Sequence, residues 1–357
     1  MLRNIWLLSA MQALMMSGNT LLITTSALVG FSLATDKSLA TLPLASQFLA
    51  TMLMTIPASL WMQKVGRRVG FATGTLLGLL GAVTLSYAVF QQQFWLFVIG
   101  TILIGMFNGF GMYYRFAAVE VATDEYKSRA ISYVMAGGVF AALVGPNLAN
   151  WTRDWTEIPF ASSYLVIAGL YIISLLALFR LRLPKPVVRS KNDSGRRLSE
   201  IMLQPVFIVA VMGGMFGFAV MSLVMTATPL AMEHHPHPFS DIAFVIQWHV
   251  LGMFVPSFFT GHLIRRWGVL KIMLLGAIFN LLCVLINLTG TSLWHYWTAL
   301  VLLGVGWNFL FVGGTTLLTE AYRAEESARV QAINDFMVYS MVTLASVTAG
   351  ALQYQFG

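Results

Sequence analysis

The sequence predicts an all-α protein that crosses a membrane many times. Of its 357 residues, 58% are hydrophobic and only 10% are charged, whereas roughly 25% of the residues in an ordinary soluble domain are charged. A soluble chain of this length could not bury so much apolar surface in one core. The apolar runs are too long and too uniform for the alternating strands of a membrane β-barrel, so the predicted spans are helices.

Eleven apolar runs are long enough to cross a bilayer, which needs about 20 residues per helix. The first run follows Arg3 and continues to about Gly30, well beyond the ~7–15 apolar residues of a cleaved signal peptide. It is therefore predicted to stay as a span. The eleven runs lie near residues 4–30, 41–62, 69–90, 94–119, 130–151, 160–182, 206–231, 241–263, 270–290, 294–319 and 329–355.

The basic residues predict the orientation of the chain in a bacterial-type inner membrane. With the N-terminus in the cytoplasm, eighteen of the 21 lysines and arginines fall in cytoplasmic loops, as the positive-inside rule requires. Only Lys37 and Arg153 fall on the other side, and Arg115 lies within a span. Basic residues spread over short loops also argue against the continuous basic face that nucleic-acid binding needs.

The sequence repeats itself at an offset of about 200 residues, which predicts two similar bundles. Basic turns around Gly66 and Gly268 follow the second span of each half, and glycine there would let the chain reverse between packed helices. Four pairs share an offset of 200 residues: Asn108 and Asn308, Glu120 and Glu320, Glu125 and Glu325, Arg129 and Arg329. We predict a six-helix N-terminal bundle over 1–182, a cytoplasmic linker over 183–205 and a five-helix C-terminal bundle over 206–357.

This organisation resembles the major facilitator superfamily. The second part of the family's loop motif, Gly-x-x-x-Asp-Arg-x-Gly-Arg-Arg, is matched by Lys64, Gly66, Arg67 and Arg68. Gln63 stands at the acidic position of that motif, so this loop departs from the family pattern. The resemblance implies two pseudo-symmetric helical bundles with twelve spans, of which eleven are predicted here and the twelfth is missing.

Three asparagines lie near the middle of spans that, by the resemblance, line the transport cavity. Asn19, Asn108 and Asn308 fall near the centres of spans one, four and ten, where polar groups are costly and usually face a cavity or a partner. They are the predicted centre of a substrate site. The alternative is interhelical hydrogen bonding, worth about 1 kcal/mol or less each. Four more residues are candidate substrate contacts: Gln47, Arg115, Gln247 and Trp307.

Two further sets of residues are candidates for proton coupling and for gating. His249 and Asp335 are ionisable residues inside spans eight and eleven, and histidine titrates near neutral pH. Opposite charges in the cytoplasmic loops could clamp the ends of each bundle and separate when the protein opens; topology and local solvation are the alternative reason for these charges. The gating candidates are Lys64, Arg67, Arg68, Glu120, Arg129, Arg266, Glu320 and Arg329.

The predicted function is secondary active transport of a small organic solute by alternating access, with the proton as candidate coupling ion. Gly145 and Pro146 are similar to a family signature of exporters and mildly favour export. The sequence has no phosphate-binding Gly-Lys-Ser/Thr loop and no hydrolytic motif, so we expect neither an enzyme nor a cofactor, and a monomer in the lipid bilayer. The run His234, His235 and His237 is interpreted as a solvated loop and not as a metal site. The alternative function is a non-transporting sensor or an inactive remnant, which the missing span favours.

Overall fold

The computed structural model describes residues 1–36, 39, 42–184, 196–234 and 237–356, and every regular element in that part of the chain is a helix. Within it, nine helices are long and apolar enough to cross a membrane. The bent pair α10 (Phe239–Phe254) and α11 (Ser257–Trp267) brings the number to as many as ten. The prediction of an all-α membrane protein is confirmed, and the predicted eleven spans are approximately correct. The chain forms two compact units, described separately below.

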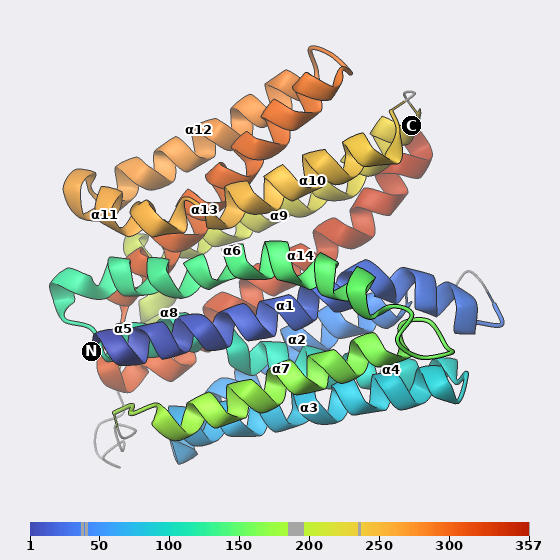
Figure 1. The fold of residues 1–357 in the computed structure, drawn as a ribbon. Helices are drawn as coiled ribbons and strands as arrows, with labels where there is room; N and C mark the ends of the chain where they lie inside the picture. The colour runs from blue at the N-terminus through green and yellow to red at the C-terminus, as the bar shows by residue number, and fades with distance from the viewer. Residues whose placement is uncertain (37–38, 40–41, 185–195, 235–236, 357) are drawn as a thin grey trace. The chain divides into compact units, whose positions relative to one another are not determined.

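Unit 1 consists of Met1–Val121 and Phe140–Arg189. Its helices are α1 (Leu2–Leu33), α2 (Leu42–Val65), α3 (Arg67–Phe90), α4 (Phe94–Gly111), α5 (Tyr114–Glu120), the second part of α6 (Lys127–Thr152) and α7 (Ala161–Arg180). Helix α3 packs against both α4 and α7, and α2 packs against α4 (Figure 1). Edge-to-face contact between Phe107 and Tyr171, with ring centroids 4.8 Å apart, ties α4 to α7.

Unit 2 consists of Ala122–Val139 and Ser190–Gly357. Its helices are η2 (Asp124–Tyr126), the first part of α6, α8 (Leu198–Met202), α9 (Pro205–His234), α10, α11, α12 (Val269–Asn287), α13 (Leu293–Ala321), η3 (Ala324–Glu326) and α14 (Ser327–Phe356). Helix α13 is central and packs against α9, α10 and α12 (Figure 1). The start of α6 joins this unit because Ser128 donates a 3.1 Å hydrogen bond to the carbonyl of Gly261 in α11.

The two basic turns have the same backbone geometry, as the repeat predicts. Gly66, between α2 and α3, has φ 90° and ψ 156°, and Gly268, between α11 and α12, has φ 89° and ψ 148°. Residues with a side chain rarely adopt such φ values. Glycine therefore allows each pair of antiparallel helices to be joined through a single residue.

Span eight of the prediction, 241–263, is broken. Helices α10 and α11 meet at an angle of 43°, and Pro256 lies between them. Proline has no N–H to donate and its ring clashes with the preceding turn, so it bends or breaks a helix. Backbone groups freed by such a break inside a membrane must find partners on neighbouring helices, which defines one of the polar clusters below.

Two predicted loops lie partly outside the described residues. Residues 185–195 of the predicted linker and His235 of the histidine run lie outside the part of the chain that the structure describes. In the same loop, Nε2 of His237 lies 2.7 Å from the carbonyl oxygen of Thr291. Among the described residues, no group of three or more potential metal ligands comes together.

Candidate functional site

The midspan asparagines of unit 1 form a buried amide cluster with Gln47. Asn19 of α1 and Asn108 of α4 bond reciprocally, since the Nδ2 of each donates to the Oδ1 of the other, at 2.8 and 2.9 Å. Gln47 of α2 donates its Nε2 to the Asn19 Oδ1 at 3.0 Å. All three residues are buried. The fold therefore brings three predicted site residues together from three helices.

This amide cluster has an acceptor left for a ligand. The Oε1 atom of Gln47 is buried and accepts no hydrogen bond from any described residue. A buried carbonyl without a donor costs about 1–3 kcal/mol, which a hydroxyl or N–H group of a solute could recover. The two asparagines use amide donors and acceptors to bond to each other. The Gln47 Oε1 is therefore the clearest hydrogen-bond acceptor for a substrate in unit 1.

Asn308 of α13, the counterpart of Asn108 in the repeat, has quite different contacts. Its Nδ2 donates to the Met253 carbonyl at 2.7 Å and to the Ser257 Oγ at 2.6 Å, and its Oδ1 accepts from the Thr260 Oγ1 at 2.7 Å. These partners lie on both sides of the break between α10 and α11. Asn308 is fully buried and supplies a hydrogen bond to one backbone carbonyl beside the break, that of Met253.

The other three predicted substrate contacts have different environments. Trp307 is buried among aromatic side chains of unit 2. Gln247, on α10, is exposed. Arg115 is buried in α5, where its Nη1 donates to the Met112 carbonyl at 2.9 Å and its guanidinium carbon lies 4.5 Å from the centroid of the Phe116 ring.

Both proton-coupling candidates are buried in unit 2. The Nδ1 of His249 on α10 lies 2.9 Å from the Leu300 carbonyl oxygen of α13, and its Nε2 has no hydrogen-bond partner among the described residues. Asp335 on α14 is 1% exposed, and its Oδ1 accepts from the Asn334 Nδ2 at 2.8 Å. Ionisable groups buried within the helices of a membrane protein are rare and usually functional.

The gating candidates of unit 1 include a close ion pair. The guanidinium of Arg67, at the start of α3, contacts the Glu120 carboxylate at the end of α5 through Nη2 at 2.7 Å and Nε at 3.1 Å. The side chains of this pair are 9% and 31% exposed. Arg68 donates its Nη2 to the Phe179 carbonyl at 3.2 Å, and Lys64 is exposed.

The gating candidates of unit 2 are not joined by a comparable pair. Arg266 and Glu320 are exposed. Arg129 lies with its guanidinium carbon 5.5 Å from the Tyr126 ring centroid, and its Nε is buried without a partner among the described residues. Nε and Nη2 of Arg329, its counterpart in the repeat, are buried in the same way.

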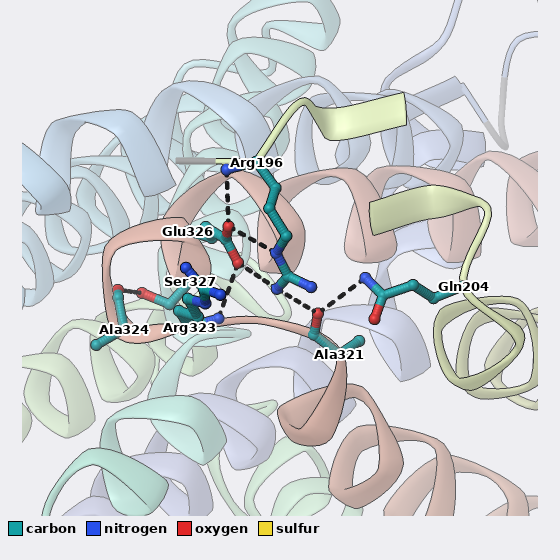
Figure 2. A network of polar contacts seen from close by, with 7 residues as sticks. All are labelled: Arg196, Gln204, Ala321, Arg323, Ala324, Glu326 and Ser327. Carbon is teal, nitrogen blue, oxygen red and sulfur yellow. Dashed lines mark hydrogen bonds and ion pairs between the residues drawn. The ribbon is translucent and has the colours of Figure 1, made fainter. Parts of the chain in front are cut away.

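Unit 2 instead contains an ion pair that the sequence did not predict. Arg196 donates to the Glu326 carboxylate from its backbone N at 3.0 Å, its Nε at 3.0 Å and its Nη2 at 2.5 Å (Figure 2). The same Nη2 reaches the Ala321 carbonyl at 3.0 Å, where Gln204 also donates at 3.2 Å. Glu326 further accepts from the backbone N of Arg323 at 2.9 Å. This network ties the segment before α8 to the turn between α13 and α14.

A second unpredicted pair joins Arg265 to Glu125 at 3.0 Å. Its side chains are 47% and 78% exposed, and such surface pairs contribute little to stability. The partners of the two unpredicted pairs lie 130 and 140 residues apart in sequence. No local pattern in the sequence could have matched them.

Acidification is expected to weaken the Arg196–Glu326 contact only at low pH. The hydrogen bonds from the Arg196 side chain lower the pKa of the Glu326 carboxyl from its ordinary 4.5 to about 2, although burial opposes the shift. A carboxyl with a lowered pKa stabilises the folded state fully above about pH 4.5, and this contribution is lost as the pH falls through about 2. A shift of this size corresponds to on the order of 3 kcal/mol. Glu326→Gln should therefore lower the melting temperature in detergent at pH 7.

The control for this prediction is Glu320→Gln, which removes an exposed carboxylate from the end of α13. The melting temperature of this variant should equal that of the wild type at both pH 7 and pH 5. Equal melting temperatures for the two variants at pH 7 would contradict the stabilising role of Glu326.

A groove of about 600 Å³ lies between α9 and α12 in unit 2. Its lining is apolar except for Asn280, whose Oδ1 is buried and has no partner among the described residues. An apolar lining suits lipid chains or an apolar helix better than a polar solute. The polar and aromatic clusters are therefore the better candidates for a solute site.

The sequence that forms these helices, glycine turns and buried polar clusters matches a known protein family. Residues 7–346 match the sequence model of the Major Facilitator Superfamily. The chain belongs to this superfamily. It is therefore a multi-pass membrane transporter of a small solute, which confirms the predicted family and the predicted class of function.

This superfamily member has relatives of described and undescribed function. The riboflavin transporter RfnT of Brucella anthropi is 42% identical to it over 359 residues, which cover 99% of this chain and 90% of that protein. The uncharacterized transporter YdeG of Bacillus subtilis is 28% identical over 307 residues, covering 81% of this chain and 70% of that protein.

Solved structures of superfamily transporters share the fold at low sequence identity. The transporter FucP in the outward conformation has a TM-score of 0.79 at 15% identity, covering 98% of this chain and 91% of that chain. An outward-facing bacterial homologue of the iron transporter ferroportin has a TM-score of 0.71 at 14% identity, with coverage of 98% and 91%. At such low identity, the likeness extends to the fold and not to the substrate.

Proposed function

We propose that this protein transports riboflavin, or a flavin with the same tricyclic ring, by alternating access across a bacterial inner membrane. The observation that carries the proposal is the 42% identity with a riboflavin transporter over 99% of the chain. The buried amide cluster of unit 1 supports it. The free Gln47 acceptor suits a solute rich in hydroxyl and N–H donors, which the ribityl chain and the imide of a flavin provide.

The proposal includes coupling to protons through His249 and Asp335. Both are buried in helices of unit 2, and a group that carries a coupling proton must be held away from bulk water while it changes charge. Conversion of His249 to Gln, or of Asp335 to Asn, removes the titrating group and keeps a side chain of similar size. Each variant is expected to exchange riboflavin but to lose accumulation driven by a pH gradient.

Orientation and direction are further parts of the proposal. The N-terminus and the basic turns lie in the cytoplasm, as the distribution of lysine and arginine favours, and the protein acts as a monomer. Export is favoured by Gly145 and Pro146 in the sequence. Gly145 also has a packing role, because a β-carbon there would lie 2.7 Å from the Thr20 Cβ and 3.0 Å from the Ser17 carbonyl of α1.

The test is riboflavin flux through purified protein in proteoliposomes, followed by flavin fluorescence. Riboflavin is supplied inside or outside, with and without an imposed pH gradient, so that substrate, direction and coupling are measured separately. Flux above that of protein-free liposomes is expected, and its absence under every condition would overturn the proposal. Riboflavin binding without flux would instead favour the sensor alternative.

A further inference from the structure

Five aromatic side chains of unit 2, four of them buried and Tyr339 partly exposed, meet in one group, called the aromatic cluster here. Phe218 is its centre, with its ring centroid 5.1 Å from that of Trp307, 5.2 Å from Phe311 and 5.8 Å from Tyr339. Phe254 completes the group, 5.9 Å from Trp307. The rings come from α9, α10, α13 and α14, so four helices of unit 2 contribute to one small volume.

The rings of the aromatic cluster are arranged as a flat pair with edges around it. Trp307 and Phe311 lie one turn apart on α13 and stack with an interplanar angle of 17° and centroids 5.1 Å apart. Phe218 meets these two rings edge-on, at 82° and 85°, and Phe254 meets Trp307 at 76°. Parallel faces bordered by ring edges match the preferred contacts of another planar aromatic system.

One polar atom in the aromatic cluster lacks a partner. Trp307 is 2% exposed, and its indole Nε1 makes no hydrogen bond with any described residue. Buried indole N–H groups usually have an acceptor, because leaving one without costs free energy. Packing alone does not require this N–H, since phenylalanine would fill an apolar cluster without it. An acceptor on a bound molecule would satisfy it.

We infer that the aromatic cluster recognises the planar heteroaromatic ring of the substrate, with Trp307 supplying both a stacking face and a hydrogen-bond donor. This inference rests on the proposed function, because a flavin has a large flat tricycle with carbonyl and ring-nitrogen acceptors along one edge. The tricycle, and not the ribityl chain, then determines affinity at this cluster. Molecules with the tricycle alone should compete, and ribitol should not.

Helix α13 offers a matched control on its opposite face. Phe309 is 4% exposed and packs against Phe279 of α12, with ring centroids 6.0 Å apart. It therefore has nearly the same burial as Trp307, on the same helix, but lies outside the aromatic cluster. Phe309→Leu removes an aromatic ring from the core of unit 2 without touching the proposed ring site.

The experiment measures riboflavin and lumichrome binding to the purified protein by flavin fluorescence, which stacking on an indole quenches. Lumichrome carries the tricycle without the ribityl chain. Trp307→Leu is expected to weaken both Kd values tenfold or more, since stacking on one aromatic side chain accounts for about that much. Trp307→Phe keeps the face and loses the donor, and is expected to weaken binding about fivefold. Phe309→Leu should change neither Kd more than about twofold.

The outcomes separate this inference from the proposed function. Lumichrome binding that depends on Trp307, in a protein that binds no riboflavin, would support the ring site and overturn only the proposed substrate. If the protein transports riboflavin, and Trp307→Leu and Phe309→Leu bind riboflavin with the same Kd, the ring site is overturned. The proposed substrate is then unaffected. If Trp307→Leu fails to fold, Trp307→Phe and competition by ribitol decide, because unchanged binding in the first or competition by the second contradicts the inference.

Discussion

Gly304→Ala is expected to destabilise the transporter by about 3 kcal/mol, near the upper end for overpacking a single site. A β-carbon on Gly304 of α13 would collide with the His249 carbonyl oxygen and lie 2.8 Å from the Met253 backbone nitrogen of α10. On the facing helix, a β-carbon on Gly252 would lie 2.9 Å from the Val301 carbonyl oxygen. Backbone atoms cannot rotate away as side chains do, so the two helices would have to separate.

The consequence should extend to the candidate site residues beside this crossing. His249 of α10 bonds to the Leu300 carbonyl of α13, and Asn308 of α13 bonds to the Met253 carbonyl of α10. Separation of the two helices would lengthen both bonds. Thermal unfolding in detergent measures the effect.

Gly169→Ala is the matched control for this substitution. A β-carbon on Gly169, in α7, would have no heavy atom within 4 Å, and alanine favours a helix by up to about 1 kcal/mol over glycine. The control should melt at the same temperature as the wild type or slightly higher. Equal melting temperatures for the Gly304 and Gly169 variants would show that α10 and α13 do not approach as closely as described.

Arg67→Ala is expected to slow the proposed transport of riboflavin at least about tenfold while leaving riboflavin binding nearly unchanged. The pair of Arg67 with Glu120 has two short charge-assisted bonds, and Arg67 is mostly buried. Such bonds contribute about 1.5–3 kcal/mol, and each 1.4 kcal/mol changes a rate tenfold. If the pair holds one state of the transport cycle, its loss alters the rate of interconversion more than the affinity. Flux in proteoliposomes and Kd from flavin fluorescence measure the two quantities.

The controls distinguish gating from a general loss of stability. Arg153→Ala removes an exposed arginine, 56% accessible, from a loop of the same unit, and should leave flux unchanged. Arg129→Ala, in a gating candidate of unit 2, should slow transport as Arg67→Ala does. Unchanged turnover in both Arg67→Ala and Arg129→Ala would refute the gating role.

The two backbone turns could be predicted from the sequence, because the need for glycine in them depends only on the local backbone conformation. Gly66 and Gly268 each stand two residues after a basic residue, Lys64 or Arg266, and both have φ near +90°. A single residue with that conformation is almost always glycine. The contacts of the turn residues were not open to prediction in the same way. Arg67, directly after Gly66, forms an ion pair with Glu120. The residue directly after Gly268 is Val269, which carries no charge.

The midspan asparagines show that residues matched by the repeat can have different contacts. Asn108 and Asn308 stand 200 residues apart at matching places in the two halves. Asn108 bonds to another side-chain amide, on α1, while Asn308 bonds to the broken span formed by α10 and α11. The difference arises from Pro256, which breaks the facing helix and frees backbone groups there.

The sequence by itself determined the solvent, the helical class and the family of this protein. Each follows from local properties: apolar runs of bilayer length, basic loops between them, and glycine where the chain reverses. Only the tertiary structure decided which polar groups pair and which stay free. Glu326 bonds to Arg196 from 130 residues away, and Gln47 and Trp307 each keep one polar atom without a partner among the described residues. Pairing depends on which helix faces meet, and that is set by packing of the whole unit and not by any segment alone.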